Sequence, residues 1–302
     1  MFANTEKIKR YYKDTASKVN ISILRYFDEI KISDDNKFLA EDILGTYKEY
    51  LFLINKLEKY KKPFIEVLKE KDIVRNQGYE GVNPTFVDVY LKSNAPSATE
   101  QLIKDKKNGT IYTKDDFVLS HGRMLLGAYS SKEVLSGLRK ENNTYVTKKV
   151  DNHLVTDYYP VDYKEIETAI QYILKIYNDN AIINEYDVMI RPILIHGLIA
   201  ALQMFKDGNT RLARVYENIM VWNLSNNVCE FEDNPTIYMS EAIYKYADRS
   251  EYRKLISDIA ITPNIQTLNK WIEYNLVLIE SQIYLNRDKI SDILPNISKI
   301  LK

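Results

Sequence analysis

The chain has 302 residues and is 45% hydrophobic, which provides enough apolar material for a sizeable core. Its 42 basic and 42 acidic side chains give a formal net charge of zero, so we expect no general attraction to nucleic acid or to a membrane surface. No stretch approaches the roughly 20 apolar residues that cross a bilayer, and the N-terminus lacks the apolar core of a signal peptide, which predicts a cytoplasmic protein.

The first part of the chain is predicted to be helical. Apolar residues recur three and four positions apart from about residue 5 to residue 75, which is typical of amphipathic helices. The stretch "NQGYEGVNP", residues 76–84, concentrates turn-forming residues and predicts the end of this region. We therefore divide the chain into an N-terminal helical region, residues 1–80, and a second domain, residues 81–302. The N-terminal region carries no recognisable motif, so packing or partner contact is its expected role.

One β-hairpin, over residues 144–159, is predicted in the second domain. Two β-branched and aromatic runs flank Asp151 and Asn152, which tolerate the left-handed conformations that hairpin turns need. A helix should follow, with Asp162 as its N-cap and Glu165 as the capping-box partner. The helices predicted after the hairpin span 162–178, 186–204, 208–226, 238–247, 250–260 and 265–285. The fold class is therefore mostly α with one hairpin, which would form a flap.

Residues 203–214, "QMFKDGNTRLAR", have the pattern of an anion-binding loop and helix start. The helix 186–204 is apolar on most faces and predicts a buried central helix. Because a new helix begins near Asn209, its first backbone N–H groups are free to hold phosphate. Arg211 and Arg214 share one face of this helix and suit bidentate phosphate contacts. Asp207 would complete a site in which one carboxylate and phosphate oxygens hold Mg²⁺.

This stretch resembles the signature of the Fic family of nucleotidyl transferases, His-x-Phe-x-(Asp/Glu)-Gly-Asn-(Gly/Lys)-Arg-x-x-Arg. The matching positions are Phe205, Asp207, Gly208, Asn209, Arg211 and Arg214. Similar segments at 135–146, 249–255 and 269–274 extend the resemblance over about residues 90 to 285. For any one of these residues, a plain turn and helix start is the simpler explanation, and it is the six positions together that favour the family.

The resemblance implies a Fic-like helical domain that transfers AMP from ATP, or uses another nucleotide, with Mg²⁺. The acceptor would be a Ser, Thr or Tyr hydroxyl of a target protein, docked on the flap hairpin as an added strand. Asp207 would hold the metal. The phosphates would be bound by Gly208, Asn209, Thr210, Arg211 and Arg214.

Two positions depart from the signature. Gln203 replaces the histidine that acts as general base, and an amide cannot take a proton from a hydroxyl near neutral pH. Thr210 places a β-branched side chain where Gly or Lys is usual, close to the expected phosphates. His196 lies seven residues before Gln203, about 10 Å away on a helix, and is expected to be a buried histidine bonded to the backbone or a carboxylate.

Glu100 is a candidate inhibitory acid. Family members often carry a helix with Ser/Thr-x-x-x-Glu-Gly/Asn, whose Glu pairs with the second arginine of the signature. Here Ser97 precedes Glu100 by three residues, not four, so the match is imperfect. A plain helix start, with Ser97 as N-cap and Glu100 as its capping-box partner, also explains both residues.

Two functional hypotheses remain. The first is an AMP transferase whose activity is slow or altered, since phosphoryl transfer depends mainly on positioning and charge. The second is a non-catalytic module that binds a nucleotide or a partner through the flap and the phosphate pocket. Gln203 favours the second. A glutamine introduced to trap a complex is a further explanation.

Overall fold

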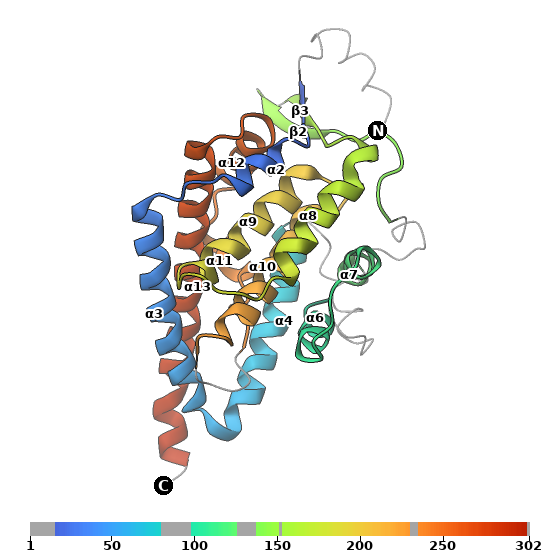
Figure 1. Ribbon diagram of the computed structural model, residues 1–302. Coiled ribbons are helices and arrows are strands. Elements are labelled where there is room, and N and C mark those ends of the chain that lie inside the picture. The colour runs from blue at the N-terminus through green and yellow to red at the C-terminus, as the bar shows by residue number, and fades with distance from the viewer. Residues whose placement is uncertain (1–15, 80–97, 126–136, 151–152, 230–234, 301–302) are drawn as a thin grey trace.

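The computed structural model describes residues 16–79, 98–125, 137–150, 153–229 and 235–300. Helices form most of this part of the chain, and a small sheet lies at one end of the helical body (Figure 1). The fold is mostly α, as predicted. Among the helices described, none combines the length and apolar character that a membrane span requires.

The elements follow the chain in this order. The strands are β1 (Ser17–Lys18), β2 (Val146–Val150) and β3 (His153–Tyr159). The helices before the hairpin are α2 (Ile23–Asp28), α3 (Asp34–Asn55), α4 (Lys61–Tyr79), α6 (Ala98–Lys107) and α7 (Lys114–Leu125), with a 3-10 turn η1 (Glu58–Tyr60). Those after it are η3 (Tyr163–Glu165), α8 (Ile166–Asn178), α9 (Asp187–Leu202), α10 (Asn209–Ser225), α11 (Ser240–Tyr246), α12 (Arg249–Ile261) and α13 (Ile265–Ile300).

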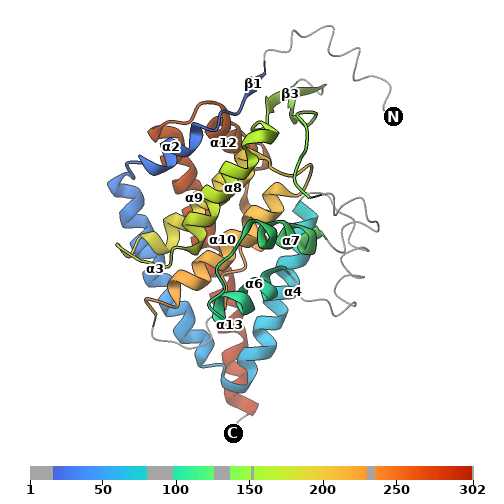
Figure 2. The ribbon, with the colours of Figure 1, turned by 45° about the vertical axis from the view of Figure 1, so that its right-hand side comes forward.

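Helix α9 is the centre of the molecule. Of its 16 residues, 13 are buried, which a helix achieves only when neighbours surround it. Helices α3, α8, α10, α12 and α13 all pack against it, and Figure 2 shows α9 between α8 and α10. The predicted buried central helix is therefore confirmed. Because the next helix, α10, packs closely on α9, the loop between them is held by both.

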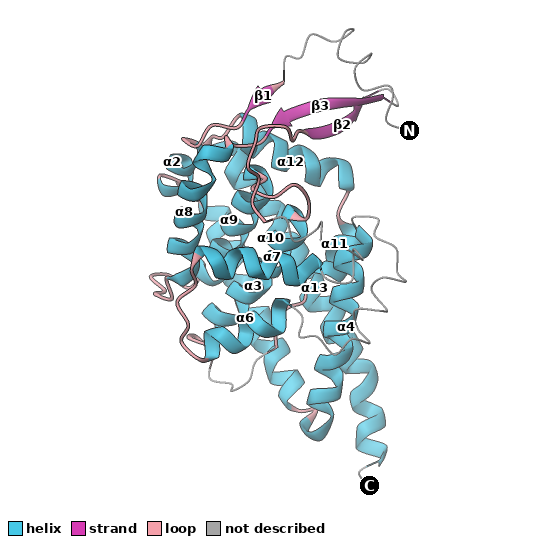
Figure 3. Ribbon diagram, turned by 90° about the vertical axis from the view of Figure 1, so that its right-hand side faces the viewer, coloured by secondary structure: helices cyan, strands magenta, loops and turns pink. Residues whose placement is uncertain are grey.

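The hairpin carries a third strand that was not predicted. β2 and β3 pair antiparallel, with Val150 opposite His153, while β1 pairs in parallel with the other edge of β3. The strand order is thus β1-β3-β2, and Figure 3 shows these strands lying over α12. The expected hairpin is confirmed, but its turn residues, Asp151 and Asn152, lie outside the described residues. A two-residue strand has no periodicity, so its pairing cannot be seen in sequence.

Three expected boundaries need correction. Helix α4 continues to Tyr79, so the first residues of the predicted turn at 76–84 are helical, and the rest lie outside the described residues. Asp162 caps the 3-10 turn η3 by accepting from the N–H of Lys164, and α8 itself begins only at Ile166. Helix α13 runs well past residue 285, to Ile300.

The N-terminal helices share the core of the rest of the chain. Helix α3 lies alongside α13, as Figure 1 shows, and also contacts α9, while α4 packs against α10 and α11. The hydroxyl of Tyr47 on α3 donates to the carbonyl of Pro235 at 2.8 Å, deep in the interior. Apolar residues of both regions thus form one cluster. The division of the chain into two domains at residue 80 stays a prediction.

A glycine controls how closely α13 approaches α9. A Cβ at Gly197 would lie 2.8 Å from Nε1 of Trp271, whose indole N–H donates to the carbonyl of Ile193 at 2.9 Å. We expect Gly197→Ala to destabilise the protein by about 1 to 3 kcal/mol, because the buried indole must move. Urea unfolding monitored by circular dichroism measures this loss.

Gly45 on α3 provides the matched control. A Cβ there meets nothing within 4 Å, so Gly45→Ala should leave stability unchanged or raise it by roughly 0.5 to 1 kcal/mol through helix propensity. Equal effects of the two substitutions would contradict the assignment of a packing constraint to Gly197.

Candidate functional site

The loop at residues 203–208 connects the buried central helix to α10. Gln203 ends α9 in the left-handed conformation, at φ +50°, and Gly208 adopts φ +80° immediately before α10. Between them, Phe205 is buried and forms an isolated β-bridge with Leu138. Two left-handed residues in six thus shape the turn that brings the start of α10 back to the end of α9.

Asn209 fixes the shape of this loop. Its side-chain oxygen accepts from the N–H of Phe205 at 3.0 Å, and its amide nitrogen donates to the carbonyl of Phe205 at 2.9 Å. The same nitrogen donates to Oε1 of Gln203 at 3.0 Å. One buried amide thus satisfies three loop groups that water would otherwise need to reach. The side chain of Asn209 shapes the loop, and its backbone N–H is part of the first turn of α10.

The side chain of Gln203 is engaged in the same network. Its amide nitrogen donates to the carbonyl of Ala200 at 2.6 Å, and its oxygen accepts from Asn209. A left-handed residue at a helix end commonly satisfies the last carbonyls through its backbone. Here the glutamine side chain also bonds one of them. The position expected to hold a base is therefore occupied by an amide that joins α9 to α10.

Arg139 connects the loop to the hairpin. Its side chain is buried, with Nε donating to the carbonyl of Gln203 at 2.7 Å and one terminal nitrogen donating to the carbonyl of Val161 at 2.6 Å. Its backbone N–H also donates to the carbonyl of Met204. Sequence reasoning marked the segment around Arg139 but gave it no role, because its partners are distant in the chain.

His121 on α7 covers the other side of the loop. Its ring stacks on Phe205 with centroids 3.7 Å apart, and Nε2 lies 2.8 Å from the carbonyl oxygen of Asp207. Since a carbonyl only accepts, Nε2 carries the proton. Burial lowers the pKa of this imidazole from 6.5 to about 4. At φ +80° any other residue at Gly208 would be strained, and a Cβ there would lie 2.9 Å from Leu125 and 3.2 Å from the His121 ring.

Asp207 and Arg211 form an ion pair at the start of α10. The distance from Oδ2 of Asp207 to the guanidinium is 2.7 Å, while Oδ1 accepts from the N–H of Gly208. The carboxylate is 57% exposed and the arginine side chain only 2%. Among the described residues no three acidic, histidine or cysteine side chains gather as a metal site. A single exposed carboxylate beside a helix N-terminus fits Mg²⁺ held mainly by phosphate oxygens.

Arg214 lies one turn further along α10 and is completely buried. Its Nε donates to Oδ1 of Asn76 on α4 at 2.7 Å, and a terminal nitrogen reaches the carbonyl of Asn76 at 3.3 Å. The amide of Asn76 in turn lies 3.4 Å from the carbonyl of Arg211. Asn76 was not expected in the site, because it belongs to the N-terminal region. Both arginines are therefore buried, Arg211 against Asp207 of the loop and Arg214 against Asn76 of α4.

Glu100 lies on α6, where its carboxylate is 2.7 Å from Nζ of Lys69 on α4. The expected partner of Glu100 is Arg214, whose Nε donates to Oδ1 of Asn76. Ser97, the proposed N-cap, lies outside the described residues, and α6 begins at Ala98. The inhibitory role of Glu100 stays a prediction.

A cleft of about 780 Å³ opens between β2, the loop and the first turns of α12. Its lining includes Gln203 and Thr210, which the sequence selected, together with Lys206. From the hairpin it takes residues 144–148 and Asp157 and Tyr158; from α12 it takes Arg249, Ser250, Tyr252, Arg253, Lys254, Ile256, Ser257 and Asp258. Asp207, Gly208, Asn209, Arg211 and Arg214 are not part of this lining. Of the loop candidates, Gln203 and Thr210 thus face the cleft, Asp207 is exposed outside its lining, and the other four are buried.

Behind the loop, a polar network joins three helices. Nδ1 of His196 lies 2.7 Å from Oε2 of Glu217 on α10, and Nε2 lies 2.6 Å from the hydroxyl of Tyr252 on α12. All three residues are buried. The prediction of a buried histidine bonded to a carboxylate is confirmed. His196 therefore stabilises the packing of the helices that carry the site.

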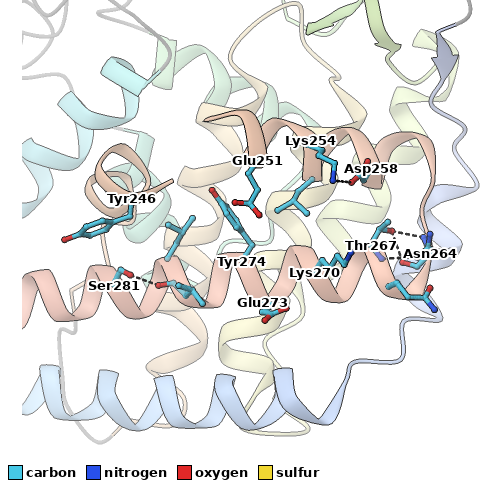
Figure 4. A pocket seen from close by; sticks show the side chains of 14 residues that line it. Tyr246, Glu251, Lys254, Asp258, Asn264, Thr267, Lys270, Glu273, Tyr274 and Ser281 are labelled. Atoms are coloured by element: carbon cyan, nitrogen blue, oxygen red, sulfur yellow. Dashed lines mark hydrogen bonds and ion pairs between the residues drawn. The ribbon is translucent and has the colours of Figure 1, made fainter. Parts of the chain in front are cut away.

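A second hollow, of about 640 Å³, lies between α12 and α13 (Figure 4). Polar and charged side chains of both helices surround it, including Glu251, Lys270 and Tyr274. Lys254 and Asp258 line both this hollow and the cleft, so α12 separates the two. None of the residues predicted for the site faces this second hollow.

Comparison with known proteins supports the fold. No family model matches the chain, and no curated protein matches it. The chain is similar to the crystal structure of a Fic domain containing signaling protein from Bacteroides thetaiotaomicron, with a TM-score of 0.55 and 13% sequence identity. The match covers 82% of this chain and 98% of that chain. At this identity the likeness shows the fold, so the chain has a Fic-like fold.

The neutral state of His121 makes the loop sensitive to acid. Because its folded pKa of about 4 lies below 6.5, the unfolded chain binds the proton more readily, and stability falls as pH decreases from 6.5 towards 4. The neutral imidazole contributes about 3 kcal/mol to the free energy of unfolding at neutral pH, and roughly 2 kcal/mol of this is lost by pH 5. Urea unfolding of the protein and of His121→Gln, at about pH 5 and pH 7, should show a smaller pH effect in the variant.

The control is His153→Gln, which changes an exposed histidine on β3 and should retain the full pH effect. An unchanged difference between the two pH values in His121→Gln would contradict the role given to this imidazole.

Proposed function

We propose that this chain binds a nucleotide with Mg²⁺ between the flap hairpin and the loop 203–208, as a relative of the AMP transferases that modify Ser, Thr and Tyr hydroxyls. The observation that carries the proposal is the N-terminus of α10 beside the cleft, preceded by left-handed Gly208 and the exposed carboxylate of Asp207. The first N–H groups of a helix attract anions because they lack intrahelical partners and lie at the positive end of its dipole.

The residues around this helix start would have different roles in binding the nucleotide. The backbone N–H groups of Asn209 and Thr210 would hold phosphate, and Thr210 would limit the space available in the cleft. The charges of Arg211 and Arg214, buried beneath the loop, would strengthen that attraction, since a buried charge is screened less than an exposed one. Asp207 would hold Mg²⁺, which neutralises phosphate charge when bound.

Gln203 determines what the bound nucleotide can do. Its amide already donates to the carbonyl of Ala200 and accepts from Asn209, and it has no basic lone pair for a hydroxyl proton. AMP transfer is therefore expected to be absent, slow or altered. Losing a positioned base typically costs on the order of 10²- to 10⁴-fold in rate.

The alternative is a non-catalytic module that binds a partner through the hairpin and the phosphate pocket. The satisfied amide of Gln203 favours it, because that side chain has a structural role independent of proton transfer. Both functions place a nucleotide and a protein target at the same cleft, and they differ in whether a covalent product forms.

Calorimetric titration with ATP and other nucleotides, with and without Mg²⁺, tests the site. In Asp207→Asn the part of the affinity that depends on Mg²⁺ should be lost, a weakening of about tenfold in Mg²⁺ and little change in EDTA. The matched control is Asp179→Asn, which removes a carboxylate that is 58% exposed and lies 3.8 Å from Arg191. An Mg²⁺ effect that survives in Asp207→Asn would exclude this carboxylate as the metal ligand.

Gln203→His tests the role of the missing base. An imidazole at this position is expected to raise transfer of labelled AMP from ATP to protein in a cell lysate by about 10²-fold or more. Gln203→Ala is the comparison. If the unmodified protein transfers AMP robustly and Gln203→Ala transfers it equally well, no group at position 203 is needed, and the idea of a degenerate base is wrong.

A further inference from the structure

His121 contacts the loop from outside the lining of the cleft. It is buried on α7, and its ring lies nearly parallel to that of Phe205, with centroids 3.7 Å apart and an angle of 10° between the planes. Phe117, one turn earlier on the same helix, also stacks on Phe205, at 5.7 Å. With the ring held in this way, Nε2 of His121 lies 2.8 Å from the carbonyl oxygen of Asp207. Helix α7 therefore brings an imidazole to a backbone group of the loop.

The peptide group between Asp207 and Gly208 connects this contact to the Asp207 carboxylate. The carbonyl and the N–H of a trans peptide group point in opposite directions, so a partner that holds the carbonyl also aims the N–H. This N–H, of Gly208, donates to Oδ1 of Asp207 at 2.7 Å, and Oδ2 lies 2.7 Å from the guanidinium of Arg211. Both oxygens of a carboxylate that is 57% exposed are thus held by groups of the protein.

The glycine leaves this peptide group without a strong preference for one orientation. Gly208 has φ +80°, and glycine adopts positive and negative φ about equally readily, so the peptide group before it could turn over at little cost. Turning over would replace the N–H beside the carboxylate by a carbonyl oxygen, which would repel it. The bond from His121 opposes this change, because the buried imidazole N–H would lose its acceptor.

We propose that His121 is a positioning residue for Asp207: it orients the peptide group 207–208, whose N–H then fixes the carboxylate that would hold Mg²⁺. Side chains that bind metals are commonly held by such outer hydrogen bonds, and losing these bonds lowers metal affinity. The part of the proposal that concerns Mg²⁺ rests on the proposed function, whereas the orientation of the peptide group does not.

The sequence allows this one peptide group to be observed by itself. Asp207 and Gly208 form the only Asp-Gly pair in the chain, so labelling Asp with ¹³C at the carbonyl and Gly with ¹⁵N gives a single directly bonded pair of labels in the NMR spectrum. Exchange of the Gly208 amide with water measures its bond to the carboxylate. This exchange should be roughly five- to tenfold faster in His121→Phe, which keeps a stacked ring without a donor, than in His121→Gln, whose amide can donate.

Ser120→Ala is the matched control. Ser120 is a buried neighbour of His121 on α7, and its hydroxyl donates to the carbonyl of Asp116 in the same helix, so exchange at Gly208 should not change. Equal exchange rates in His121→Phe and His121→Gln, or an increase in Ser120→Ala as large as that in His121→Phe, would overturn the proposal. A His121 ring protonated at Nδ1 and not at Nε2, seen in the ¹⁵N spectrum of the unmodified protein, would overturn it whether or not a variant folds.

Calorimetry with ATP separates this proposal from the proposed function. His121→Phe should bind ATP roughly three- to fivefold more weakly in Mg²⁺, with little change in EDTA, and His121→Gln should recover most of the loss. An equal loss in Mg²⁺ and in EDTA would leave His121 a structural role only and contradict the proposal. If the unmodified protein binds no ATP but Gly208 responds to the His121 variants as expected, the orientation of the peptide group stands and the proposed function is wrong.

Discussion

The buried guanidinium of Arg139 is the contact on which the arrangement of the cleft depends. It bonds the carbonyl of Gln203 at the end of α9 and the carbonyl of Val161 just after β3, so the loop and the hairpin are held together. A buried charge is tolerated only where such partners replace water. The hairpin also packs on α12, and the N–H of Val161 donates to the carbonyl of Leu202, so Arg139 strengthens a connection between the two walls of the cleft that the backbone also makes.

Buried amides and arginines next to Arg139 determine the shape of the loop. Asn209 satisfies the backbone N–H and C=O of Phe205, and Gln203 bonds the carbonyl of Ala200 at the end of α9. The arginines of α10 are buried under the loop, where one meets Asp207 and the other meets Asn76. The proposed phosphate site would depend on the backbone N–H groups at the start of α10 and on the charge of these buried arginines.

Local patterns in the sequence predicted most of the helices and the hairpin, because periodicity and turn chemistry are properties of neighbouring residues. They could not predict β1, whose two residues acquire their conformation from β3, or the continuation of α13, where Asn286 becomes a core residue by donating to the carbonyl of Ile237. The spacing of the loop residues identified the candidate site. It could not show that Arg214 is buried, or that His121 and Asn76 complete the site, since those contacts come from α7 and α4.

The bond between Asn76 and Arg214 has a consequence for how the chain can be divided. Asn76 belongs to the region before residue 80, yet it bonds a guanidinium that is completely buried in α10. A fragment starting at residue 81 would remove this amide together with the rest of α4, and water would have to solvate Arg214 in its place. Shortening the protein from its beginning would therefore alter the helix that carries the loop, although the cut falls more than a hundred residues before it in the sequence.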